Sequence, residues 1–260
     1  PAGAALGTTC AQAISVVISL CMIIRQRKEF SLSREDFRLS HNIMGHILKI
    51  GIPIALQDGF IQVAFMIITI IANQRGLNDA AAVGIVEKII SFLFLIPSSM
   101  LSTVSALGAQ NIGAGKRQRA NETLRYAVLI TVGFGIIVGI FMQFFASPVV
   151  ALFTDASDAS GAEVVRLGGQ YLRGYVWDCM FAGIHFSFSG YFCACGKSGI
   201  SFLHNIIAIT LVRIPGVYLT STLFPDTLFP MGLATAAGSL LSAIICVVAF
   251  TILNGKERQK

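Results

Sequence analysis

Charged side chains are scarce in this sequence. Asp, Glu, Lys and Arg make up 12% of its 260 residues, whereas a soluble domain typically carries about 25%. Hydrophobic residues make up 55%, and the mean hydropathy is +0.75. A surface with so few charges cannot lie mostly in water, so the composition excludes an ordinary soluble domain and predicts a membrane protein.

Signatures of enzymes and of cofactor sites are also missing. The sequence contains no glycine-rich phosphate loop, no H-E-x-x-H and no G-x-S-x-G, which would indicate nucleotide, zinc or serine-hydrolase chemistry. All six cysteines lie in apolar runs, and Cys193-x-Cys195 has no second Cys or His cluster nearby to complete a metal site. We therefore expect no enzymatic activity, no cofactor, no disulfide framework and no structural metal.

Long apolar runs dominate the sequence instead. A helix needs about 20 mostly apolar residues to cross the hydrocarbon core of a bilayer. Seven runs predict an all-α membrane protein of about seven transmembrane helices: Ala4–Ile24, Ile52–Ala72, Ala80–Leu107, Tyr126–Phe145, Gly168–Cys195, Ile200–Leu223 and Met231–Leu253. The chain begins at Pro1 with a full span, so we expect it to be a fragment of a longer protein.

Basic residues are distributed unevenly between the two ends of these spans. Fourteen Lys and Arg residues fall in the first, third and fifth loops and the C-terminal tail, against three at the opposite ends, Arg75, Arg166 and Arg173. Cytoplasmic loops carry such an excess, so these loops and the tail are predicted to be cytoplasmic. The net charge of +6 is then a topology signal, and we expect no nucleic-acid partner.

Three of the predicted spans carry polar side chains along one face. Ionisable groups at membrane depth cost about 2.5–3.5 kcal/mol each on insertion scales, so they are functional candidates. At about 100° per residue, the stripes are Asp58, Gln62, Thr69 and Asn73; Glu87, Ser91, Ser98, Ser102 and Ser105; and Tyr171, Gly174, Asp178, His185 and Ser189. We expect these faces to line a shared wet cavity or to bond to one another.

Other interpretations of these residues stay open. The hydroxyls could bond to carbonyls of their own helices, and Asp178 could pair with Arg173 near the outer surface. Arg213 precedes Pro215, so it could reach carbonyls that the proline frees, or it could contact substrate. Small residues on two further faces predict close helix packing: Thr131, Gly135 and Gly139, and Gly232, Thr235, Ser239, Ser242 and Cys246.

Three motifs, in this order, resemble those of the multidrug and toxic compound extrusion (MATE) family. They are Gly51-Ile52-Pro53-Ile54-Ala55-Leu56-Gln57, then Gln110-Asn111-Ile112-Gly113-Ala114-Gly115-Lys116 with Arg119-Ala120 after it, and then Val212-Arg213-Ile214-Pro215. The second motif is the most specific. The residues from Gly3 to Gln12 resemble the end of that family's N-terminal lobe, so the resemblance spans nearly the whole chain.

The resemblance implies a transporter of two six-helix lobes. Residues 1–24 would be the last helix of the N-terminal lobe, 25–50 a cytoplasmic linker, 51–254 the C-terminal six-helix lobe and 255–260 a cytoplasmic tail. The missing N-terminal lobe would be a partner, and the protein would sit as a multi-pass protein in a bacterial inner (plasma) membrane. No cofactor is implied beyond Na⁺ or H⁺ as the coupling ion.

The implied function is secondary active multidrug export, in which a cation gradient drives drugs or organic cations across the lipid bilayer. Two alternatives remain. A lipid or polysaccharide flippase of the same superfamily should line its cavity with several Arg and Lys residues. A non-transporting membrane scaffold should tolerate Ala or Leu along its polar stripes.

Asp178, His185 and Asp58 are the predicted cation-coupling residues. A carboxylate in a poorly solvated cavity binds a proton or a cation more readily, and a drug cation would compete for the same charge. Asp178 and His185 are seven residues apart, which places them two turns apart on one face, about 10 Å along the axis. The predicted substrate cavity is lined by Gln57, Gln62, Thr69, Glu87, Tyr171, Ser189 and Arg213.

Overall fold

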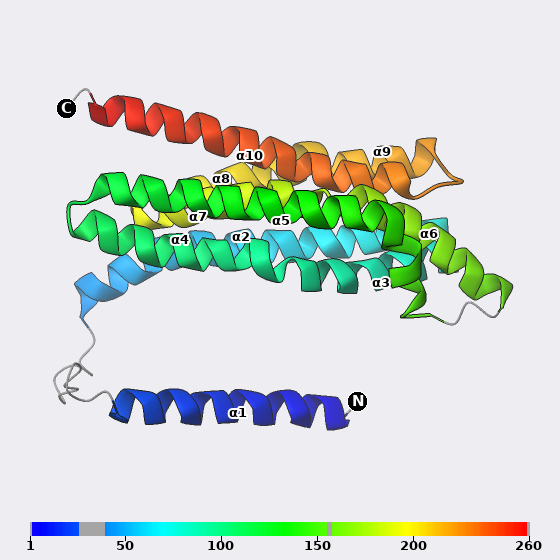
Figure 1. The fold of residues 1–260 in the computed structure, drawn as a ribbon, viewed down its shortest axis with the longest axis horizontal. Coiled ribbons are helices and arrows are strands. Elements are labelled where there is room, and N and C mark those ends of the chain that lie inside the picture. Colours follow the sequence, from blue (N-terminus) through cyan, green and yellow to red (C-terminus); the bar gives the residue numbers. More distant parts are fainter. Residues whose placement is uncertain (1, 26–39, 155–157, 259–260) are drawn as a thin grey trace. The chain divides into compact units, whose positions relative to one another are not determined.

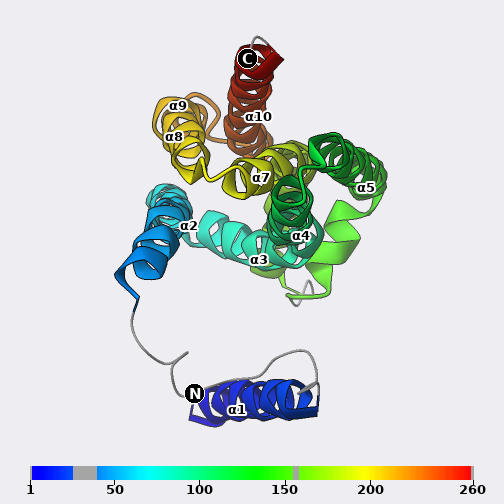
Figure 2. The ribbon, with the colours of Figure 1, turned by 90° about the vertical axis from the view of Figure 1, so that its left-hand side faces the viewer.

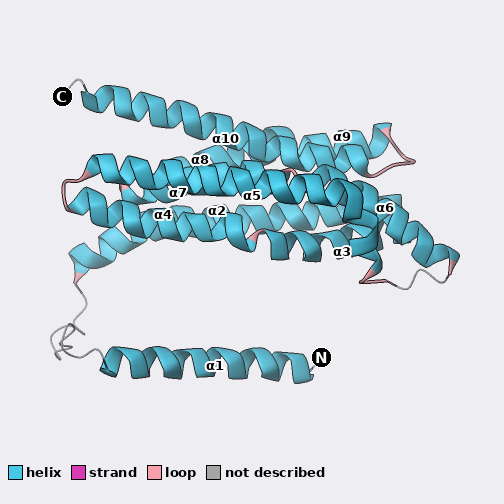
Figure 3. Cartoon of the chain, viewed as in Figure 1, coloured by secondary structure: helices cyan, strands magenta, loops and turns pink. Residues whose placement is uncertain are grey.

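All regular secondary structure in the described residues, 2–25, 40–154 and 158–258, is helical in the computed structural model (Figure 3). The chain divides into two units, Pro1–Gly45 and His46–Lys260. The first contains α1 and the start of α2, and the second contains the helical bundle.

The first unit contains α1, Ala2–Arg25, whose apolar stretch is Thr9–Arg25. Every side chain of that stretch is exposed within the unit. Most of the linker predicted over residues 25–50 lies outside the described residues. Its last ten residues are helical, because α2 already begins at His41.

The bundle consists of nine α-helical segments and one π-helical segment in the described residues. They are α2 His41–Arg75, α3 Leu77–Leu93, α4 Leu95–Gly113, α5 Arg117–Ala151, α6 Ala159–Tyr175, α7 Asp178–Ala194, α8 Ser198–Ala208, the π-helix η2 Ile209–Arg213, α9 Ile214–Leu223 and α10 Phe229–Arg258.

Five helical stretches are long and apolar enough to cross a membrane. Among the described residues these are His41–Arg75, Leu77–Gly113, Arg117–Ala151, Ser198–Leu223 and Phe229–Leu253. They cover five of the seven predicted runs. The first run lies in α1, and the run Gly168–Cys195 is divided between α6 and α7. The prediction of an all-α membrane protein is confirmed.

Helix α7 is central in the bundle and contacts α4, α5, α8 and α10 (Figure 2). Glycines allow this close approach, because a Cβ at Gly183 would overlap Thr131 of α5 and one at Gly190 would overlap the carbonyl oxygen of Leu101 in α4. The small-residue faces predicted on α5 and α10 are buried at such contacts, so the predicted close packing is confirmed.

The basic loops within the described part of the bundle share one end. Figure 1 shows the α4–α5 loop, the α7–α8 turn and the end of α10 at that end, with the α2–α3 junction and the α9–α10 loop at the other. This arrangement agrees with the one-sided distribution of Lys and Arg. Which side of the membrane holds the basic end stays a prediction.

Arg75 joins two loops at the opposite end. Its Nε donates to Asp79 Oδ1 at 2.8 Å, Nη1 donates to the carbonyl oxygen of Ser221 at 2.7 Å, and Nη2 donates to that of Pro225 at 2.6 Å. The Arg75 side chain is only 9% exposed. It therefore fastens the α2–α3 junction to the end of α9 and the loop that follows.

We expect Arg75→Met to destabilise the bundle. Hydrogen bonds from a charged donor contribute about 1.5–3 kcal/mol, and this substitution leaves the apolar stem in place while removing the donors. The free energy of unfolding, measured by denaturant titration in micelles, should fall by about that amount. Arg166→Met is the matched control, because Arg166 pairs with Glu163 on an exposed surface where ion pairs contribute little. Equal losses in the two variants would contradict the role of Arg75 in holding the two loops together.

Candidate functional site

Two helices are interrupted where their polar residues lie. The predicted run Gly168–Cys195 breaks at Val176 and Trp177, so Asp178 becomes the first residue of α7. The positive end of a helix dipole stabilises a carboxylate there. In the next span, the N–H of Ile214 bonds to the carbonyl of Ile209, five residues earlier.

The π-helical segment η2 has an identifiable cause. Pro215 lacks an N–H and its ring crowds the carbonyl four residues before it, which a regular α-helix cannot accommodate. A single wide turn relieves this crowding, and such turns are frequent at functional sites. The last residue of η2 is Arg213, and its side chain is buried.

Asp178 and Arg213 form an ion pair inside the bundle. Nη2 of Arg213 donates to Oδ2 of Asp178 at 2.7 Å and to the hydroxyl of Tyr175 at 3.3 Å. The two charged side chains are 0% and 8% exposed. The Arg213 Cζ also lies 5.5 Å from the ring centre of Phe65, on α2. Asp178 thus pairs with Arg213 of the next span, and the open pairing with Arg173 is not the arrangement found.

The pair leaves part of its bonding capacity unused. Nε of Arg213 is buried without a hydrogen-bond partner, while the Ser239 hydroxyl of α10 lies within hydrogen-bonding reach of the Asp178 carboxylate. Gly238 of α10 makes room for the arginine, because a Cβ there would lie 2.8 Å from the Cβ of Arg213. Unpaired atoms of buried charges are costly.

A buried histidine connects three helices near this pair. His204 of α8 lies 2.9 Å from the hydroxyl of Ser189, on α7, through Nε2, and 2.6 Å from that of Ser242, on α10, through Nδ1. The His185 ring centre is 5.6 Å from that of His204, and His185 Nδ1 is buried without a partner. Ser242 was predicted only as part of a packing face, and His204 was not among the predicted site residues, although a histidine within an apolar run is a sufficient signal.

The predicted site residues separate into two groups. Asp178, His185, Ser189, Arg213, Tyr171 and Gln57 are buried inside the lobe. Asp58 and Gln62 are exposed on α2. Thr69 and Glu87 are partly buried, so their exposure is intermediate between those of the two groups. The Thr69 hydroxyl donates to Glu87 Oε1 at 3.2 Å, which joins α2 to α3.

Exposed polar residues also occur on α3 and α4. Ser91 of α3 and Ser98 and Ser102 of α4 are exposed, and each hydroxyl donates to a carbonyl of its own chain three or four residues earlier. Bonding of hydroxyls to carbonyls of their own helices, one of the interpretations left open above, is therefore what these serines do. We call the exposed polar residues Asp58, Gln62, Ser91, Ser98 and Ser102 the polar face of α2, α3 and α4, and exposed apolar side chains such as Met66 and Phe92 lie on the same helices.

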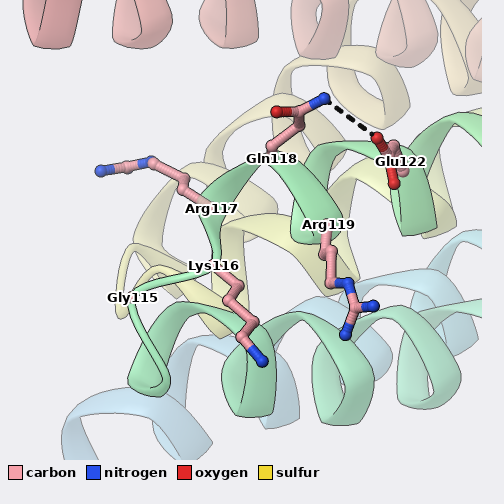
Figure 4. Close-up of a pocket in the computed structure, with 6 residues that line it drawn as sticks. All are labelled: Gly115, Lys116, Arg117, Gln118, Arg119 and Glu122. Atoms are coloured by element: carbon pink, nitrogen blue, oxygen red, sulfur yellow. Dashed lines mark hydrogen bonds between the residues drawn. The ribbon is translucent and has the colours of Figure 1, made fainter.

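A hollow at the basic end does not form a convergent site. It is lined by Gly115, Lys116, Arg117, Gln118, Arg119 and Glu122. Figure 4 shows Arg117 pointing away from Lys116 and Arg119, while Gln118 bonds to Glu122. In the described residues, no three His, Cys, Asp or Glu side chains are grouped as metal ligands. The buried Asp178–Arg213 pair is therefore the strongest candidate site.

Comparison with known proteins agrees with this architecture. The sequence is 28% identical to the probable multidrug resistance protein YpnP of Bacillus subtilis over 85% of this chain and 48% of that protein. It is 25% identical to an FAD transporter of Shewanella oneidensis over 94% of this chain and 52% of that protein. The chain spans about half the length of these curated relatives.

Solved structures show the same fold. A crystal structure of MATE in complex with MaL6 matches 94% of this chain and 55% of its own, with a TM-score of 0.84 at 18% identity. The sequence profile of the MatE family matches residues 53–219, which is more than half of the chain. This protein therefore belongs to the MATE family of multidrug and toxic compound extrusion transporters.

Proposed function

We propose that this chain supplies the C-terminal lobe of a secondary active exporter. The complete transporter exchanges Na⁺ or H⁺ for hydrophobic, often cationic, small molecules across a bacterial inner membrane, with the N-terminal lobe as the second half of the pathway. The single observation that carries the proposal is the Asp178–Arg213 pair, buried inside the bundle where two helices are interrupted. Such groups are costly in a membrane and persist mainly where they serve transport.

In this proposal, the guanidinium of Arg213 is a cation fixed to the protein that binds Asp178 when the coupling ion is absent. This group bonds to Oδ2 of Asp178 and leaves Oδ1 free of the arginine. A coupling ion that reaches Asp178 competes with Arg213 for the carboxylate. Releasing the guanidinium changes the contacts of η2 with α7, Phe65 and Tyr175. Ion binding is thereby linked to the packing of α2, α7 and η2, which a mechanism of alternating access needs.

The polar face of α2, α3 and α4 is the proposed substrate surface. It exposes Asp58 and Gln62 together with serines, a set that suits an organic cation better than an anion. Thr69 and Glu87 connect α2 and α3 beneath this face. Phe65, which contacts Arg213, is on α2, so substrate at the face and the ion at Asp178 are coupled through one helix.

The test is Asp178→Asn in the complete transporter. The amide keeps the shape but cannot take up a proton or hold a cation by charge. Ethidium efflux driven by an imposed ion gradient should fall at least about tenfold, equivalent to about 1.4 kcal/mol on the transport barrier. The double variant Asp178→Asn, Arg213→Gln should fail equally, and it removes the unpaired buried arginine as an explanation.

The matched control is Glu163→Gln, which makes the same chemical change at a surface pair and should leave efflux unchanged. Wild-type efflux in both Asp178 variants would refute the coupling role. Two further outcomes identify the alternatives. Preferential transport of an anion such as FAD would favour the flippase-like substrate class. Absence of transport in the wild type would favour a scaffold.

A further inference from the structure

A series of buried polar side chains runs through the inside of the C-terminal lobe. It starts near the basic end, where the Ser198 hydroxyl donates to the carbonyl of Lys49 and Ser201 donates to that of Ser189. It ends at the Asp178–Arg213 pair. These side chains come from α7, α8, η2 and α10, which pack together (Figure 2). All are buried: Ser198, Ser201, His204, Asn205, His185, Ser189, Ser239 and Ser242.

Within this series, His204 bonds to two hydroxyls, and each of them can act as donor or acceptor. A neutral imidazole donates through one ring nitrogen and accepts through the other, and a hydroxyl can do either. The chain Ser242–His204–Ser189, with separations of 2.6 and 2.9 Å, is therefore satisfied in two opposite directions. Conversion between them moves each proton along one hydrogen bond without breaking the heavy-atom arrangement.

His185 lies between this chain and the ion pair. It is one turn from Ser189 on α7, about 6 Å along the axis, and two turns from Asp178. Its ring is 5.6 Å from that of His204, and its Nδ1 is buried without a partner. The titratable groups that interact with it electrostatically are His204 of α8 and Arg213 of η2.

We propose that Ser242, His204 and Ser189 form a proton relay, with His185 as the next acceptor toward Asp178. This inference rests on the proposed function, and it makes the proton the coupling ion. A proton arriving at the Ser242 oxygen lets that hydroxyl pass its own proton to Nδ1 of His204. Nε2 then releases its proton to Ser189, whose hydroxyl passes one proton onward. Only O–H and N–H bonds change, and one proton crosses the chain.

A purely structural histidine would make the same hydrogen bonds, so the test must retain them. In the complete transporter, His204→Gln keeps one donor and one acceptor for the two hydroxyls, but an amide does not carry protons in this way. Substrate-driven proton movement in proteoliposomes, followed with a pH-sensitive dye, should slow about tenfold, or about 1.4 kcal/mol on the barrier. Equilibrium binding of ethidium should be unchanged.

The matched control is Ser187→Ala. Ser187 is also buried on α7, but its hydroxyl donates only to the carbonyl of Gly183 in the same helix, and proton movement should stay at the wild-type rate. Ser242→Ala is the second variant, because it shortens a small side chain and removes one end of the relay. It should reproduce the slow proton movement even where His204→Gln does not fold.

The outcomes separate the relay from the proposed function. Wild-type proton movement in His204→Gln or in Ser242→Ala would overturn the relay. If efflux in those variants is normal and driven by Na⁺ at constant pH, while Asp178→Asn is inactive, the relay is wrong and the exporter proposal stands. If Asp178→Asn is active, the exporter proposal fails in its coupling residue, and the relay fails with it.

Discussion

Arg213→Gln alone should destabilise the lobe more than any other single polar substitution considered for this bundle. It leaves Asp178, which is 0% exposed, without its 2.7 Å partner. Removing one member of a buried ion pair costs about 3–5 kcal/mol, because the remaining charge is uncompensated. The free energy of unfolding in micelles should fall by that amount, and yield from the membrane should fall with it.

The double variant Asp178→Asn, Arg213→Gln should recover most of this loss. It replaces two charges by two amides that can bond to each other, so no charge remains buried. The coupling energy from the double-mutant cycle should exceed the value of about 0.5 kcal/mol within which independent sites are additive. Additive effects would show that the two side chains do not depend on each other for folding. The proposed role in coupling predicts that this folded double variant still does not export.

Gly232→Ala should separate α10 from α6. A Cβ at Gly232 would overlap the carbonyl oxygen of Tyr171 and lie 2.8 Å from the backbone nitrogen of Tyr175. Neither backbone atom can rotate away, so the helices must move apart. Overpacking of this kind costs about 1–3 kcal/mol, and the upper end applies here because Gly174 makes the reciprocal contact, with its Cβ position 2.5 Å from the carbonyl oxygen of Phe229.

Gly133→Ala is the control for this substitution. Gly133 lies in α5, and a Cβ there would meet no atom within 4 Å. The change should be neutral or stabilising by about 0.5–1 kcal/mol, the ordinary preference for alanine over glycine within a helix. Thermal unfolding of both variants in the same detergent measures the difference. A loss in Gly232→Ala no larger than in Gly133→Ala would contradict the close α6–α10 contact.

Helical periodicity predicted the small-residue faces and the polar stripes, because both depend only on spacing along one helix. Thr131 and Gly232 could be assigned to packing faces for that reason. Spacing did not predict that the stripe containing Asp178 would be divided between two helices, with that residue as the first of the second helix. The turn at Val176 and Trp177 contains neither glycine nor proline, so the sequence carries no ordinary break signal there.

The pairing of polar groups between helices was not predictable in the same way. Arg213 and Asp178 are separated by 35 positions, and His204 and Ser242 by 38. Periodicity places each residue on a face, but it does not give the rotation of one helix against another. That rotation depends on glycines such as Gly238, which let backbones and side-chain stems approach.

The sequence by itself determined that this is an all-α membrane protein, where its apolar runs lie and, through three motifs, which family it resembles. These properties follow from composition and local order, since a bilayer requires apolar helices of fixed minimum length. Only the tertiary structure decided that Asp178 is paired with Arg213, that His204 links three helices and that Asp58 is exposed. Those facts depend on side-chain packing between segments distant in the chain, because hydrogen bonds and ion pairs form only at the short distances that packing sets.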